Sequence, residues 1–265
     1  MTSSKQDGMR SLIVGNWKMH GLAARLAEIE ALAAALKAQP ADVDIVICPP
    51  FTLIERSTRA AAGMLAIGGQ DCHPQPSGAC TGDVSAEMLG DAGALAVIVG
   101  HSERRQQHGD TDSIVAAKAA AGRRAGLMTI ICIGESGVQR DAGEALRACS
   151  AQLAGSLPPG LSALTCAIGY EPLWAIGTNL TPTTEQIVEM HAHIRRCLVT
   201  QLGAEGQAMR ILYGGSVKAD NARAILALPQ VGGALIGGAS LKDAEFESIV
   251  RSVPARSHAP SRDAR

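Results

Sequence analysis

Short runs of apolar residues recur along the chain and alternate with longer amphipathic stretches. Each run is apolar at consecutive positions rather than at every second one, which is typical of parallel strands covered on both faces. The pattern predicts eight strands, at residues 12–15, 45–48, 64–67, 97–100, 129–132, 164–168, 210–213 and 233–236.

The stretches between these runs have apolar residues spaced three and four positions apart, as in helices that pack on one face. Two such stripes are formed by Leu22, Leu26, Ile29, Leu32 and Leu36, and by Ile187, Met190, Ile194, Cys197 and Leu198. Thr183 and Gln186 precede the second stripe in a capping-box arrangement, which predicts a helix start there. Further helices are predicted around residues 51–60, 85–91, 112–125, 138–154, 219–227 and 243–251.

Eight repeats of strand and helix predict a (β/α)8 barrel. A doubly wound sheet is the alternative, but it would normally have fewer strands and a glycine-rich turn after the first one. Here the first strand is followed by Asn16-Trp17-Lys18. No linker or low-complexity segment interrupts residues 10–251, so we expect a single domain there, with residues 1–9 and 252–265 as flexible termini.

The charge balance and composition narrow the classes of function. Lys and Arg number 24 and Asp and Glu 25, so the net charge of −1 offers no basic surface for nucleic acid or an anionic membrane. Aromatic residues make up only 2%, fewer than a base-stacking module usually carries. No apolar run is long enough to span a bilayer. The seven cysteines, without a C-x-x-C pair, are expected to be reduced. These features predict a cytoplasmic protein.

Polar and glycine-rich residues follow five of the predicted strands. Because active sites of (β/α)8 barrels lie at the carboxyl ends of the strands, we expect these residues to meet at one mouth. They are Asn16 and Lys18 after the first strand, His101, Ser102 and Glu103 after the fourth, Glu171 after the sixth, Gly214, Gly215 and Ser216 after the seventh, and Gly237 and Gly238 after the eighth.

This set of residues is typical of proton abstraction next to a carbonyl group. Glu171 is a candidate base, His101 a candidate donor to a carbonyl oxygen, and Lys18 a positive charge for a phosphate or an oxyanion. The glycine turns near Ser216 and Gly237 leave backbone N–H groups for a phosphate. Each residue has a plain alternative, as a structural histidine, a surface lysine, a strand end or an ordinary turn. The prediction depends on their coincidence at corresponding strand ends, and it includes no metal site.

Five segments carry a resemblance to a known family. They are residues 15–19 (GNWKM), 100–105 (GHSERR), 170–178 (YEPLWAIGT), 213–217 (YGGSV) and 236–241 (IGGASL). All are similar to signatures of the triosephosphate isomerases and follow that family's order and spacing over nearly the whole chain. The resemblance implies a cofactor-free enzyme of glycolysis and gluconeogenesis. It would interconvert dihydroxyacetone phosphate and D-glyceraldehyde 3-phosphate through an enediolate.

The resemblance also implies roles for individual residues. Glu171 would move a proton between two carbons, His101 would polarise the carbonyl as a neutral imidazole, and Lys18 and Asn16 would stabilise the oxyanion. The division between base, neutral histidine and closing lid is the one established for this family. Glu103 is similar to an acid buried beside the family's site, either as a partner of Lys18 or as a proton shuttle.

Other residues are implied to bind the phosphate and to form a lid over the site. The implied phosphate-binding residues are Gly177, Ser216, Leu235, Gly237 and Gly238. The lid would comprise residues 172–181, where Asn179 replaces a usual glycine. Pro182 ends the lid and has no N–H for a backbone latch.

A homodimer is implied as well. The loop at residues 75–84 would enter the partner's site, and Cys80 in it replaces an aromatic residue often seen at the dimer contact. The implied contacts are Thr81 at the loop tip, Asp83 with the partner's Arg104, and Gln70 near the mouth.

Three other functions stay open on the sequence alone. An isomerase of a four-carbon ketose phosphate would use the same residues. A Schiff-base aldolase needs a lysine on a central strand, whereas Lys18 lies beyond the strand end. A non-catalytic phosphate-binding barrel would normally lack Glu171, His101 or Lys18, and all three are present.

Overall fold

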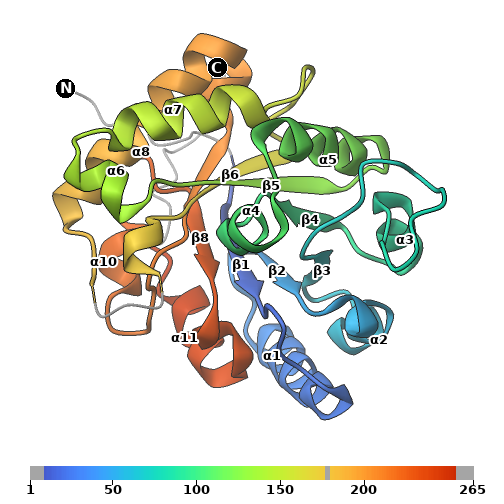
Figure 1. Ribbon diagram of the computed structural model, residues 1–265. Coiled ribbons are helices and arrows are strands. Elements are labelled where there is room, and N and C mark those ends of the chain that lie inside the picture. The colour runs from blue at the N-terminus through green and yellow to red at the C-terminus, as the bar shows by residue number, and fades with distance from the viewer. Residues whose placement is uncertain (1–8, 177–179, 255–265) are drawn as a thin grey trace, which may run out of the picture.

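The computed structural model describes residues 9–176 and 180–254. Within this part of the chain, eight parallel strands pair in chain order and close into a barrel (Figure 1). The strands are β1 (Ser11–Asn16), β2 (Val43–Cys48), β3 (Ala66–Gly69), β4 (Ala96–Val99), β5 (Met128–Ile133), β6 (Cys166–Tyr170), β7 (Arg210–Tyr213) and β8 (Gly233–Ile236). The closed ring confirms the predicted fold and excludes the doubly wound sheet.

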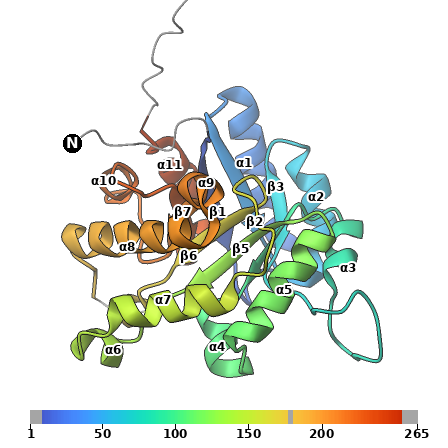
Figure 2. The same ribbon diagram turned by 90° about the horizontal axis from the view of Figure 1, so that it is seen from above.

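Helices surround the strands on the outside (Figure 2). They are α1 (Leu26–Ala38), α2 (Ile54–Ala61), α3 (Ala86–Asp91), α4 (Ser102–His108), α5 (Asp112–Arg124), α6 (Gly137–Asp141), α7 (Ala145–Ser156), α8 (Thr184–Leu202), α9 (Ala204–Ala208), α10 (Ala222–Leu226) and α11 (Asp243–Arg251). Short 3-10 turns lie at η1 (Ala23–Arg25), η2 (Phe51–Leu53), η3 (Leu173–Ala175) and η4 (Gly238–Leu241).

The continuous apolar runs are explained by two separate cores. In β4, Ala96 and Ile98 belong to the cluster inside the barrel, whereas Val97 and Val99 belong to the cluster between strands and helices. Successive side chains of a strand point to opposite faces, so both faces must be apolar when both are covered. The capping box at Thr183 and Gln186 is confirmed at the start of α8.

Some predicted boundaries are wrong. The third strand begins at Ala66 rather than residue 64, and the sixth at Cys166 rather than residue 164. The predicted helix at 138–154 is two helices, α6 and α7, separated at Gly143, whose φ is +73°. Leu22, expected on the first helical stripe, precedes the helix and is 82% exposed. The polar helix α4 was not predicted, because it has no apolar stripe.

An ion-pair cluster lies at the amino-terminal end of the barrel. Arg210, the first residue of β7, donates to the Asp44 carboxylate of β2 at 2.7 Å, and Arg10 pairs with the same carboxylate at 2.7 Å. These paired charges tie β1, β2 and β7 together at the end opposite the candidate site.

The structure bears on two further expectations. Residues 1–8 and 255–265, most of the predicted flexible termini, lie outside the described residues. Among the described helices, none combines the length and apolar character needed to cross a bilayer.

Candidate active site

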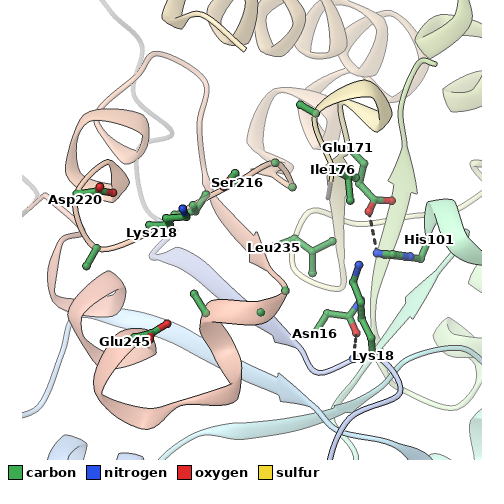
Figure 3. A pocket seen from close by; sticks show the side chains of 18 residues that line it. Asn16, Lys18, His101, Glu171, Ile176, Ser216, Lys218, Asp220, Leu235 and Glu245 are labelled. Atoms are coloured by element: carbon green, nitrogen blue, oxygen red, sulfur yellow. Dashed lines mark hydrogen bonds and ion pairs between the residues drawn. The ribbon is translucent and has the colours of Figure 1, made fainter. Parts of the chain in front are cut away.

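A pocket of about 850 Å³ opens at the carboxyl ends of the strands (Figure 3). Most of the predicted site residues line it together: Asn16, Lys18, His101, Glu171, Ser216, Leu235, Gly237 and Gly238. They come from β1, β4, β6, β7 and β8 and the loops that follow these strands. The predicted phosphate ligand Gly177 and the lid residue Asn179 lie outside the described residues.

Glu171 follows β6 directly and is held by its backbone and its side chain. Its N–H donates to the Ile133 carbonyl of β5 at 2.8 Å. At the neighbouring Gly134, a Cβ atom would lie 1.8 Å from the Glu171 carbonyl oxygen, so only glycine allows this close approach. The carboxylate accepts the Ser102 N–H at 3.0 Å and lies 2.9 Å from His101 Nε2. Contacts to its backbone and to its carboxylate therefore hold Glu171 beside His101.

His101 lies at the start of α4, and its two ring nitrogens have different partners. Nδ1 accepts the Glu103 N–H at 3.3 Å, whereas Nε2 faces Glu171. Burial lowers the pKa of His101, but the charges of Glu171 and Glu103 outweigh burial and raise it. An Nδ1 that accepts a hydrogen bond carries no proton, so this contact favours a neutral ring with hydrogen on Nε2. Movement of Glu171 away from Nε2 would remove the main cause of the raised pKa.

The carboxylate of Glu171 is buried, yet it is ionised at neutral pH. Burial raises the pKa of Glu171, but His101, the Ser102 N–H and Lys18 together lower it below its usual value. Glu171 can exchange these partners for others when its side chain moves, whereas its site stays buried. A ligand that draws Glu171 away from them would leave burial as the dominant effect and make the carboxylate a stronger base.

Lys18 is held in an unusual backbone conformation at the pocket wall. Its φ is +54°, a left-handed value that is uncommon for a residue with a side chain. The Asn16 Oδ1 accepts the Lys18 N–H at 3.0 Å, and Gln70 Nε2 donates to the Lys18 carbonyl at 2.8 Å. Asn16 and Gln70 thus stabilise the strained residue from two sides.

The amine of Lys18 is paired with Glu103. Lys18 Nζ lies 2.7 Å from Glu103 Oε1, which agrees with the expected partnership between the two residues. Glu103 itself is not the buried acid expected from the sequence. Its side chain is 43% exposed because it lies on the outer edge of the mouth, in the first turn of α4.

The opposite side of the pocket is formed by backbone. An added Cβ atom at Gly238 would meet no atom within 4 Å, and one at Gly237 would lie 3.6 Å from Lys18 Cε, so there is open space beside this turn. Leu235 supplies an apolar surface beside it (Figure 3). The arrangement leaves room for an anion to approach the main chain.

Three charged residues of the pocket were missed in the sequence. Lys218, Asp220 and Glu245 line its outer part, beyond Ser216 (Figure 3). Lys218 and Asp220 follow the Gly-Gly-Ser turn after β7, so reading a few residues further would have found them. Glu245 lies in the first turn of α11, where the rule of inspecting strand ends gives no signal.

A second buried carboxylate lies beneath the predicted lid and was also missed. Glu135 Oε1 accepts hydrogen bonds from Trp174 Nε1 at 2.8 Å, Arg140 Nε at 2.8 Å and the Tyr170 hydroxyl at 3.2 Å. The Arg140 guanidinium also lies 5.0 Å from the centre of the Trp174 ring. Glu135 therefore anchors the first turn of the lid to the body of the barrel.

The residues expected at a dimer contact have partners within the chain. Arg104 NH2 lies 2.9 Å from Asp71 Oδ2, and Asp83 Oδ2 lies 3.7 Å from His73 Nε2. Thr81 is exposed near the tip of the loop after β3. Contact of these residues with a second copy stays a prediction.

Comparisons with known proteins all identify the same family. The family model described as triosephosphate isomerase matches residues 11–253. A triosephosphate isomerase of Rhodopseudomonas palustris is 54% identical over 249 residues, covering 93% of this chain and 98% of that protein. One from Xanthobacter flavus is 56% identical over 245 residues, covering 92% and 98%. The crystal structure of the Bartonella henselae triosephosphate isomerase superposes with a TM-score of 0.86 at 43% identity, covering 92% of this chain and 99% of that one.

Proposed function

Because this chain belongs to the triosephosphate isomerase family and interconverts dihydroxyacetone phosphate and D-glyceraldehyde 3-phosphate, we propose that Glu171 moves the proton between the two carbons. The observation that carries this assignment is the 2.9 Å contact between Glu171 and His101 Nε2 at the wall of the pocket. It puts a carboxylate base and an N–H donor at adjacent points, as isomerisation through an enediolate requires.

The first step is removal of a proton from the carbon next to the carbonyl. The carboxylate of Glu171 leaves Ser102 and His101, turns to the substrate and takes up that proton, while the carbonyl π electrons move onto oxygen. The enediolate forms, and Glu171 then returns the proton to the adjacent carbon. A second proton passes between the two substrate oxygens, and we assign its transfer to His101, which gives its Nε2 proton to one oxygen and takes the proton of the other.

The negative charge on the enediolate needs donors that are already in place. His101 supplies its Nε2–H, and Lys18 supplies a positive charge held at the same wall by Asn16 and Gln70. Glu103 keeps the Lys18 amine positioned before substrate binds. Donors fixed in advance stabilise the transition state without reorganising during the reaction.

The phosphate group of the substrate is proposed to bind on the opposite side of the pocket. Ser216, Gly237 and Gly238 line the pocket there, with Leu235 alongside. The family resemblance implies Gly177, which lies outside the described residues, as a further phosphate ligand. Binding energy from this non-reacting group helps to hold the reacting carbons against Glu171.

A coupled assay tests this function directly. The full-length protein is supplied with D-glyceraldehyde 3-phosphate, and formation of dihydroxyacetone phosphate is followed with glycerol-3-phosphate dehydrogenase. We expect turnover, and much slower turnover of a four-carbon ketose phosphate. Folded protein with no turnover of the triose phosphate would contradict the proposal.

We also propose a homodimer formed by the loop at residues 75–84 and the neighbouring surface. Gln70, which directly follows β3 and precedes that loop, donates to the Lys18 carbonyl, so Met19, the next residue, lies near the same surface. Met19 is 94% exposed in the single chain, so its apolar side chain is accessible to a second copy there.

Sedimentation velocity tests the dimer with a matched pair of variants. Met19→Glu places a charge on the proposed interface and should shift the protein toward monomer. Leu164→Glu changes an exposed apolar residue just before β6, at the other end of the barrel, and should leave the dimer intact. A monomeric native protein, or equal effects of the two variants, would contradict the proposed interface.

We also propose a cytoplasmic location. It is supported by the place of this family in glycolysis.

A further inference from the structure

Gln152 of α7 bonds to both backbone groups of one residue at the end of β5. Its Nε2 donates to the Gly134 carbonyl at 2.8 Å, and its Oε1 accepts the Gly134 N–H at 2.9 Å. The pair of bonds fixes the orientation of the amide, because a reversed amide would place donor against donor and acceptor against acceptor. Gln152 is not among the described residues that line the pocket, so its contacts concern the wall behind the site.

The main chain of Glu171 runs along this end of β5. The Glu171 N–H donates to the Ile133 carbonyl at 2.8 Å, and the Leu173 N–H donates to the Glu135 carbonyl at 3.1 Å. Gly134 lies between these two acceptors, and a Cβ atom there would lie 1.8 Å from the Glu171 carbonyl oxygen. The position of the Gly134 backbone therefore limits where the Glu171 backbone can lie.

Gln152 supplies the bonds that a neighbouring strand would make on the other side of β5. The parallel pairing of β4 with β5 ends at Val99 and Ile131. Successive residues of an extended strand direct their N–H and C=O groups to alternate sides, so Gly134 directs its two groups away from β6 and toward the side of β4. There the Gln152 amide meets both groups, as a strand would.

We propose that Gln152 is a positioning residue for Glu171 and acts through the backbone of Gly134. The inference rests on the proposed function, in which the Glu171 carboxylate leaves His101 and turns to the substrate (Figure 3). A side chain that turns needs a fixed backbone, because the carboxylate must meet the reacting carbon at the end of its movement. The sequence analysis did not identify Gln152, because it inspected the strand ends and Gln152 lies in a helix.

Steady-state kinetics of Gln152→Met with D-glyceraldehyde 3-phosphate tests the proposal. Methionine has nearly the length of glutamine but forms neither bond with Gly134. We expect kcat to fall by at least about tenfold, since a displacement of roughly 1 Å in a reacting group can cost about 100-fold. KM should change by less than about threefold, because the residues proposed to bind the phosphate follow β7 and β8 and keep their places.

Leu153→Val is the matched control for a loss of stability. Leu153 is the next residue of α7 and is 0% exposed in the core, so its truncation loosens the packing of the same helix. The Gly134 bonds stay in place in this variant, and its kcat should stay within about twofold of the native value. Thermal unfolding of both variants shows that they are folded at the assay temperature and compares their losses of stability.

A double variant separates action through Glu171 from an independent effect. In Glu171→Asp the carboxylate is already displaced, so adding Gln152→Met should lower kcat by less than about a further threefold. Gln152→Glu keeps the acceptor for the Gly134 N–H but, when ionised, has no donor for the Gly134 carbonyl. It should also lower kcat, and it keeps the test valid where Gln152→Met fails to fold.

Three outcomes are decisive. A kcat of Gln152→Met within about twofold of the native value, or no lower than that of Leu153→Val, would overturn the proposal. So would an equal fold loss when Gln152→Met is added to the native protein and to Glu171→Asp. Failure of the proposed function gives a different result, because Glu171→Asp alone would then keep the native kcat.

Discussion

Two carboxylates follow neighbouring strands of this barrel and have equal burial but different surroundings. Glu135, after β5, is 0% exposed, and Glu171, after β6, is 2% exposed. Glu135 is paired with the guanidinium of Arg140 and bonded to Tyr170 and Trp174. Glu171 contacts His101 and the Ser102 N–H and faces the pocket.

The difference shows that burial alone does not make a base. A guanidinium stays charged at any working pH, so Glu135 has a permanent counter-ion in Arg140. The partners of Glu171 are an imidazole and a backbone N–H, both of which it can leave when it moves. Burial then raises its proton affinity, and only this carboxylate has a pocket in which a substrate can present a carbon acid.

The largest expected effect comes from shortening each carboxylate by one methylene. Glu171→Asp should lower kcat by at least about 100-fold, because a displacement of roughly 1 Å in a reacting group can cost that much. Glu135→Asp, the matched change at an equally buried site, should lower kcat by less than tenfold while weakening the lid anchor. Steady-state kinetics with D-glyceraldehyde 3-phosphate measures both. Equal losses of kcat in the two variants would contradict the distinction between Glu171 as the base and Glu135 as a structural anchor.

Removing the charge of Glu135 should act on stability instead. In Glu135→Gln the largely buried Arg140 loses its counter-ion, which should lower the free energy of unfolding by roughly 3 kcal/mol. The double variant with Arg140→Met removes both charges and should recover part of that loss. Denaturant unfolding of the native, single and double variants gives the comparison. A single variant as stable as the native protein would show that the Glu135–Arg140 pair is not a structural anchor.

A third buried titratable group, His191, makes the stability of the fold depend on pH. It therefore limits the pH range in which variants of the two carboxylates can be compared. Burial lowers the pKa of His191 to about 4, although the Gln230 carbonyl opposes this effect. The unfolded chain takes up this proton near pH 6.5, so stability should fall as pH drops from about 6.5 toward 4 and then level off. The lowered pKa corresponds to a loss of at most about 3 kcal/mol.

Thermal unfolding between pH 7 and pH 4 measures this effect. His191→Gln has no group that titrates in this range at that site, so its melting temperature should fall less steeply with pH than that of the native protein. Parallel slopes for the two proteins would remove His191 as a cause of acid sensitivity.

The sequence was most informative where one residue or a short run determines the local structure. The apolar runs predicted the eight strands of the barrel. The polar residues that follow these runs predicted that Glu171, His101 and Lys18 lie close together. The third strand was placed too early because its last residues, Gly68 and Gly69, carry no hydrophobic signal, whereas Met64 and Leu65 before it do.

The parts that sequence did not predict depend on contacts between distant positions. Glu135 is a strand-end residue like Glu171, but its role depends on Trp174, 39 positions further on. Likewise, helix α4 is polar throughout and is stabilised by its place at the mouth, where Arg105 donates to the carbonyls of Gly100 and Cys132. No periodicity in the sequence reports such contacts.

Exchange with solvent tests the central claim, that Glu171 carries the proton between the two carbons. A proton on a carboxyl group exchanges with water, so turnover in D₂O by the native enzyme should place deuterium on the carbon next to the carbonyl of product and recovered substrate. Glu171→Gln, which has no carboxylate to carry a proton, should show no incorporation above the uncatalysed level. Native turnover without deuterium incorporation, or incorporation by Glu171→Gln at the native rate, would contradict the account.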